Sequence, residues 1–206
     1  VRALLFFHMV RKFGDIPLVT EEITTKEQAV ALAFRVKEVE VYKQIVKDLT
    51  DALDSNLPNQ QWEYQVGRTS KTAINALLGQ VYLTMGTTFT DDKQANLLKA
   101  EQHLEAAYAA RTFGELSEIN YSDVFDVNQK MNCKELIFQV QYLQGDQKYH
   151  SNIARNNQAR GENINSQFPS TGVGTRASKD LVNEYEVGDI RKEFSVKFAT
   201  DSRVND

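Results

Sequence analysis

Aromatic side chains close to planar polar groups are the most chemically suggestive feature of this sequence. Trp62, the only tryptophan, lies in the polar stretch 59–67, where packing into a core does not obviously require it. Tyr142 and Tyr149 precede a second stretch, 152–167, which is rich in amides and contains two arginines. Flat rings can stack on the apolar face of a ligand, and amide and guanidinium groups can hydrogen-bond its polar atoms. The candidate ligand-binding residues are therefore Trp62, Tyr142, Tyr149, Asn152, Arg155 and Asn156.

These residues also have a purely structural interpretation. The Trp62 ring could fold back over the neighbouring helix ends. The residues support this interpretation and ligand stacking about equally. The stretch 152–167 has too little apolar material to bury itself, and the residues alone favour a solvated surface loop there. A single tryptophan also counts against a large binding surface built from aromatic rings. The residues by themselves leave both interpretations open.

Catalytic and metal chemistry have little support in the sequence. Cys133 is the only cysteine and has no evident histidine or base near it, so a disulfide, a thiolate metal cluster and an activated nucleophile are not expected. The three histidines lie far apart along the chain. The segment Gly172-Val-Gly174 lacks the Lys-Ser/Thr pair of a phosphate-binding loop. We expect no catalytic residue, no metal site and no cofactor.

The composition favours a mostly helical protein that does not bind nucleic acid. The chain has 206 residues, enough for about one domain with a sizeable core. Its 24 Lys and Arg against 28 Asp and Glu give a net charge of -4, so there is no excess of positive charge to displace counterions from a phosphate backbone. Only 3 Pro and 10 Gly are present, too few for the many tight turns of a β-sandwich.

Four segments have the apolar periodicity of amphipathic helices. We expect them at 2–13, 36–54, 69–85 and 93–110, packed as antiparallel pairs, with a further short turn of helix within 25–32. Gly14 follows the first helix in a position where a positive φ is favourable, and Thr69 or Ser70 caps the third, which is expected to end at Gly86. The apolar stripe expected to face the core in the first helix is Leu5, Phe6, Met9, Val10 and Phe13.

Beyond Gly114 the periodicity changes. Apolar and polar residues alternate with a period of two in 135–142 and again in 194–198, which predicts two short strands. Between them, Ser178 can cap a short helix that ends by Gly188. The second half of the chain is therefore expected to be rich in loops.

The last two of the four helices resemble a tetratricopeptide unit. In that repeat, small residues let two antiparallel helices approach closely, as Gly79 and Gly86 could here, and large residues fill the remaining space. Tyr82 and Leu104 should then be buried between the helices. Asn75 stands where the repeat prefers Trp, and the connecting loop is long. The alternative is an ordinary helical hairpin that contains glycine. The spacing of these residues alone favours the ordinary hairpin.

Five segments follow one another in the order typical of a known family. They are 2–19, which includes the run Val10-Arg-Lys-Phe-Gly-Asp-Ile-Pro-Leu-Val19, then 41–52, 67–83, 135–138 and 185–191. Together they closely resemble the SusD/RagB family of surface nutrient-binding lipoproteins. Lys37 departs from the family, which often has a capping Ser there. The resemblance covers essentially all of this chain but only the middle of a family member.

The resemblance implies a mostly α, tetratricopeptide-like platform that binds an oligosaccharide or similar nutrient without a catalytic step. It implies a partner, a TonB-dependent transporter of the SusC type, to which the ligand is delivered. It also implies a cell-surface lipoprotein that is held at the outer membrane only by an N-terminal lipid, which is absent from this chain. The apolar run 3–10 is itself too short to span a membrane. A helical-repeat module that binds another protein is the alternative function.

The chain begins and ends within periodic segments, so we expect an internal piece of a longer protein. Residues 1–206 are then a single helical domain truncated at both ends, with a helical core at 1–114 and a loop-rich part with short strands at 115–206. Apolar residues such as Phe194 and Phe198 should be incompletely covered in such a piece.

Overall fold

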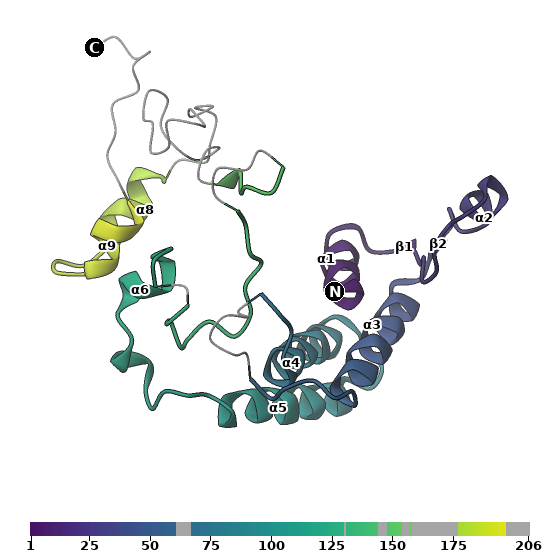
Figure 1. The fold of residues 1–206 in the computed structure, drawn as a ribbon, viewed down its shortest axis with the longest axis horizontal. Helices are drawn as coiled ribbons and strands as arrows, with labels where there is room; N and C mark the ends of the chain where they lie inside the picture. The colour runs from purple at the N-terminus through teal and green to yellow at the C-terminus, as the bar shows by residue number, and fades with distance from the viewer. Residues whose placement is uncertain (61–66, 130, 144–147, 154–156, 158–176, 197–206) are drawn as a thin grey trace, which may run out of the picture. The chain divides into compact units, whose positions relative to one another are not determined.

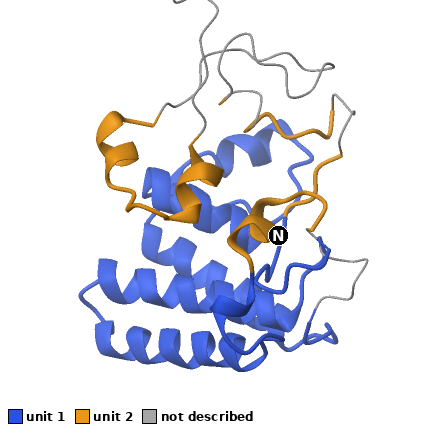
Figure 2. Ribbon diagram, turned by 90° about the vertical axis from the view of Figure 1, so that its left-hand side faces the viewer, with its two compact units in different colours: residues 1–119, 131–139 blue, residues 120–130, 140–206 orange. Residues whose placement is uncertain are grey.

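The structure, a computed structural model, describes residues 1–60, 67–129, 131–143, 148–153, 157 and 177–196 (Figure 1). The chain divides into two compact units, which Figure 2 shows in different colours. The first consists of Val1–Ile119 and Met131–Gln139, and the second of Asn120–Lys130 and Val140–Asp206. That residues 1–206 form a single domain stays a prediction.

The first unit is helical, with one short pair of strands (Figure 1). The two strands pair in antiparallel fashion, with Ile16 opposite Val36. The four long helices lie within three residues of their predicted bounds, and the mostly α fold is confirmed. In chain order the elements are α1 (Arg2–Phe13), β1 (Ile16–Pro17), α2 (Lys26–Ala31), β2 (Arg35–Val36), α3 (Glu38–Leu53), α4 (Lys71–Thr88), α5 (Lys93–Ala109) and the short 3-10 helix η1 (Leu116–Glu118).

The second unit holds short helices, described at α6 (Tyr121–Phe125), α8 (Lys179–Asn183) and α9 (Ile190–Ser195). The predicted cap of α8 is confirmed, because the Leu181 backbone N–H donates to Ser178 Oγ at 3.1 Å. Gly188 has a φ of 88°, a conformation that glycine adopts without strain, in the turn that leads to α9. Among the described helices, none is long and apolar enough to cross a membrane.

Both strands predicted beyond Gly114 are wrong for the described residues. Residues 135–143 are extended or turn-like and pair with no strand, and alternation alone supplies no partner for a ladder. Phe194 lies in α9 and is 48% exposed, while its ring packs 6.0 Å from Tyr121 and 5.7 Å from Phe125. Helical packing in this aromatic cluster replaces the predicted strand. Phe198 lies outside the described residues.

The main core lies between α1, α3 and α4. In α1 the buried stripe is Ala3, Phe6, Phe7 and Val10, one step around the helix from the predicted one. Leu5, Met9 and Phe13 are exposed, so their assignment to the core is wrong. Both faces of α1 are apolar, and only contact with α3 decides which face is covered. From α3 and α4 the fully or nearly fully buried residues are Val41, Tyr42, Ile45, Leu49, Ile74, Leu78, Val81 and Tyr82.

Polar contacts fix α1 and the start of α3. Arg2 donates two hydrogen bonds to the Asp48 carboxylate, at 2.6 and 2.7 Å, and these bonds hold the pKa of Asp48 below its usual value. The Glu38 backbone N–H donates to Asp15 Oδ1 at 2.9 Å, which lowers the pKa of Asp15. Lys37, the N-cap residue, makes no side-chain cap. Asp15 therefore supplies a side-chain acceptor for one of the backbone N–H groups that have no partner within α3.

Helices α4 and α5 form a closely packed antiparallel hairpin. A Cβ added at Gly79 would lie 2.5 Å from Leu104 Cγ, and one at Gly86 would lie 2.9 Å from Leu97 Cγ. The prediction that Gly86 ends α4 is wrong, since this residue lies inside the helix. The role of Gly86 is instead to leave room for the Leu97 side chain of α5. Such small-residue contacts are those expected of a tetratricopeptide-like hairpin.

The predicted burial of Tyr82 and Leu104 is half right. Tyr82 is 8% exposed and belongs to the core. Leu104 is 39% exposed, because one side of its side chain packs on Gly79 while the other faces away from α4. The prediction that Leu104 is buried is therefore wrong. Its contact with Gly79 of α4 is nevertheless the contact that the repeat pattern requires.

A half-buried polar cluster occupies the same interface. Nδ1 of His103 lies 2.9 Å from Oδ1 of Asn75, so the neutral tautomer with a proton on Nδ1 donates to the amide oxygen. The His103 ring stacks on Tyr82 with centroids 5.6 Å apart, and Lys99 Nζ lies 5.3 Å from the centre of the Tyr82 ring. Burial, aided by the charge of Lys99, lowers the pKa of His103 below 6.5. Asn75, in the place of the repeat's Trp, thus has a polar partner.

Gly79→Ala should destabilise the first unit by about 1–3 kcal/mol, because the added methyl group overlaps Leu104 and outweighs the better helix propensity of Ala. Urea denaturation of the wild type and variant measures the change. In a Leu104→Ala background the same substitution should cost far less, since the overlapping atoms are gone. An equal loss in both backgrounds would contradict the close approach of the helices.

His103 should make stability fall in mild acid. Its folded pKa is lowered, so between that value and about 6.5 the unfolded state binds more protons, and the stabilisation present above about pH 6.5 is lost as the pH falls through the folded pKa. His103→Gln should remove this part of the pH dependence of the urea midpoint, whereas His8→Gln, at an exposed position on α1, should retain it. Identical pH profiles for the wild type and His103→Gln would count against the cluster.

Candidate ligand-binding site

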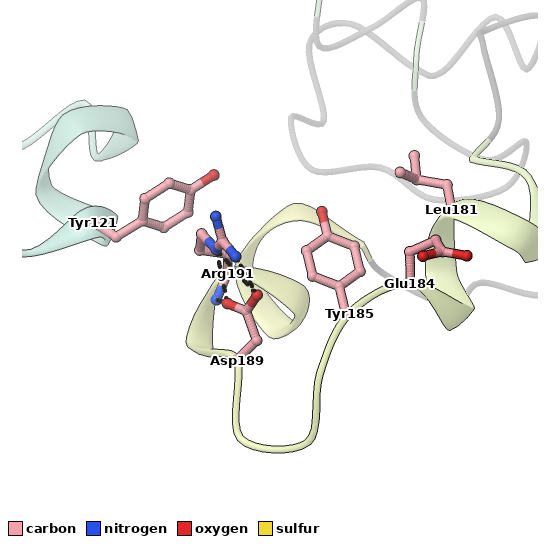
Figure 3. A pocket seen from close by; sticks show the side chains of 6 residues that line it. All are labelled: Tyr121, Leu181, Glu184, Tyr185, Asp189 and Arg191. Atoms are coloured by element: carbon pink, nitrogen blue, oxygen red, sulfur yellow. Dashed lines mark hydrogen bonds and ion pairs between the residues drawn. The ribbon is translucent and has the colours of Figure 1, made fainter.

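The second unit contains an open pocket of about 350 Å³ (Figure 3). Aromatic, apolar and charged side chains from α6, α8, α9 and the turn between the last two line it. They are Tyr121, Leu181, Glu184, Tyr185, Asp189 and Arg191. The pocket therefore combines flat rings with groups that can donate and accept hydrogen bonds.

An internal ion pair forms one side of the pocket. The Arg191 guanidinium donates to both carboxylate oxygens of Asp189, at 2.6 Å from Nη2 and 2.9 Å from Nε (Figure 3). Asp189 also accepts from the Arg191 backbone N–H at 3.0 Å, so it caps α9 with the same carboxylate. The Arg191 hydrogen bonds hold the pKa of Asp189 below its usual value. The pair therefore braces the turn that leads into α9.

The Tyr121 side chain is held in place by its neighbours. Its ring packs against Phe125 and Phe194, with centroids 5.2 and 6.0 Å away. Its hydroxyl lies 3.2 Å from Ser195 Oγ, close enough for a hydrogen bond. These contacts set the orientation of the ring before any ligand arrives.

The structure places half of the predicted site residues. Tyr142, Tyr149 and Asn152 are exposed in the second unit. The backbone N–H of Leu143, the residue after Tyr142, donates a 3.0 Å hydrogen bond to the backbone carbonyl of Tyr149. Asn152 lies beside His150, with Oδ1 2.8 Å from Nε2. Trp62, Arg155 and Asn156 lie outside the described residues, and the ligand-binding role of all six stays a prediction.

Of the predicted residues that the structure describes, Tyr142, Tyr149 and Asn152, none lines the pocket. Sequence reasoning missed it because Tyr121 is distant in sequence from the segment 181–191 that supplies the other five residues. A signal was nevertheless present, since Tyr185 and the Asp189–Arg191 pair belong to one of the segments that resemble the family. In the part of the chain that the structure describes, no group of three or more His, Cys, Asp or Glu side chains could hold a metal ion.

The close helical hairpin in the first unit defines a helical protein of tetratricopeptide-like type, and known proteins refine that class. Residues 1–83 match a SusD-like family described as starch-binding and associating with the outer membrane. The chain is 32% identical over 142 residues to SusD-like protein P2 of Formosa agariphila. The chain therefore belongs to the SusD superfamily.

Solved structures agree with this assignment. A SusD superfamily protein of Parabacteroides distasonis is similar over 93% of the chain, with a TM-score of 0.74 and 25% identity. Another from Bacteroides fragilis is similar over 93% of the chain, with a TM-score of 0.64 and 26% identity. The chain spans 26% of the Formosa relative, 38% of the Parabacteroides protein and 41% of the Bacteroides protein.

Proposed function

We propose that this chain is part of a cell-surface lipoprotein that binds an oligosaccharide and delivers it to a TonB-dependent transporter of the SusC type. The protein acts by binding and release, with no catalytic step. Its attachment to the outer membrane is through an N-terminal lipid outside this chain, and its ligand-binding face points away from the membrane.

The match of residues 1–83 to a starch-binding, outer-membrane-associated family carries this proposal. That match spans α1, α3 and most of α4, the helices that hold the main core. The exposed Tyr142 and Tyr149 add support, because exposed rings near polar side chains suit saccharide binding.

A protein-binding role for the hairpin is the second candidate. Leu98 and Tyr108 on α5 are more than half exposed, and exposed apolar residues on a repeat-like helix suit a protein partner. A glycan array probed with the intact protein separates the two roles. Binding to a defined set of glycans supports the first, whereas an array with no binding favours the second.

Trp62→Ala should weaken binding to the best glycan on that array by about 1–3 kcal/mol, if a sugar ring stacks on the indole. Isothermal titration of the wild type and variant measures the loss. Thermal melts provide the folding control, since a ring that contacts only the ligand would leave the melting temperature nearly unchanged when it is removed. Tyr149→Ala is a matched variant at a second predicted position.

An unchanged affinity for Trp62→Ala would remove this residue from the site. A fall in melting temperature that accounts for the whole loss would assign the ring to structure. Either result transfers the prediction to Tyr142, Tyr149 and the amide-rich stretch 152–167.

A further inference from the structure

We propose that the pocket lined by Tyr121, Tyr185 and Glu184 is a subsite for a neutral saccharide, in which Glu184 accepts hydrogen bonds from sugar hydroxyls and Tyr185 packs on the sugar ring. This inference rests on the proposed function and goes beyond it by naming the residues and the charge class of the ligand. The pocket lies within the second unit alone.

Glu184 is the acceptor available to a ligand. The other carboxylate in the pocket, Asp189, is already engaged by Arg191 side-chain and backbone donors at 2.6–3.1 Å. Within the described residues, no hydrogen bond or ion pair engages the Glu184 carboxylate, which is on an exposed residue at the end of α8. A carboxylate accepts through two oxygens, so it can bind two neighbouring hydroxyls of one sugar.

Two tyrosines and a leucine supply the apolar surface. Tyr185, in the turn after α8, is only partly exposed, and Leu181 on α8 also lines the pocket. Tyr121 is fixed by Phe125, Phe194 and the Ser195 hydroxyl. Rings held in place before binding reduce the ordering cost of association. A sugar ring has apolar C–H faces and a polar rim, and this lining offers a partner for each.

The charge of the pocket favours a neutral ligand. The Asp189 and Arg191 charges offset each other in their ion pair, which leaves the Glu184 charge uncompensated. The surrounding segment 177–196 carries five Asp or Glu against three Lys or Arg. An anionic sugar, such as a uronate, would meet repulsion here, whereas hydroxyls meet an acceptor.

The test is titration calorimetry of the full chain with neutral oligosaccharides, namely maltoheptaose, cellohexaose, laminarihexaose and xylohexaose, and with an oligogalacturonate of similar length. The strongest neutral ligand is then carried to the variants. Glu184→Gln and Tyr185→Ala should each weaken binding about tenfold or more, as expected for a charge-assisted hydrogen bond and an aromatic contact. Glu186→Gln, an exposed carboxylate two residues away that does not line the pocket, is the matched control and should bind like the wild type.

The outcomes separate this inference from the proposed function. If a neutral glycan binds and both pocket variants bind it as the wild type does, the subsite is wrong and glycan binding stands. A preference for the oligogalacturonate overturns the charge argument and with it the subsite. Binding of none of the sugars overturns both. Tyr185→Phe, which keeps the ring, should retain most of the affinity. Thermal melts of Tyr185→Ala show whether its loss of binding comes from misfolding.

Discussion

The first unit depends on the position of α4. This helix contacts α3 on one side and α5 on the other, and three of its residues, Ile74, Leu78 and Val81, are almost completely buried. Its approach to α5 is set by Gly79 and Gly86, where a side chain would overlap a leucine of the partner helix. The close packing of α5 thus requires glycine at the positions where α4 faces it. Without this close packing of α4 and α5, the Tyr82 and His103 rings could not stack and Asn75 would lose its hydrogen-bond partner.

The helices of this unit could be predicted because their signals are local. Ser70 caps α4 and Gly14 follows α1 with a φ of 63°, both as expected from residue type. The phase of α1 was mispredicted, because apolar residues cover most of its circumference and only the neighbour α3 selects Phe7 over Leu5. Gly86 was misread as a stop signal for a similar reason, since only the contact with Leu97 shows its role. The predicted strands failed because alternation in one segment says nothing of a partner.

The candidate site was harder to predict than the fold. The Asp189–Arg191 pair joins residues two apart in the sequence, and it braces the start of α9. The pocket also needs Tyr121, which only the tertiary fold brings to α9. The predicted Tyr142 and Tyr149 are exposed, as a ligand-contacting ring must be, but exposure is common to binding residues and solvated loops. Local sequence thus identifies suitable side chains, whereas their assembly into a concave site depends on long-range packing.

Mapping where a sugar binds tests the central claim most directly. The measurement is an amide NMR titration of the isotope-labelled chain with the neutral oligosaccharide that it binds best. The account predicts shift changes that grow with ligand concentration at Tyr121 and across 181–191, with the α4–α5 hairpin almost unchanged. Shift changes concentrated on the exposed face of α5, around Leu98 and Tyr108, with none at the pocket, would contradict it.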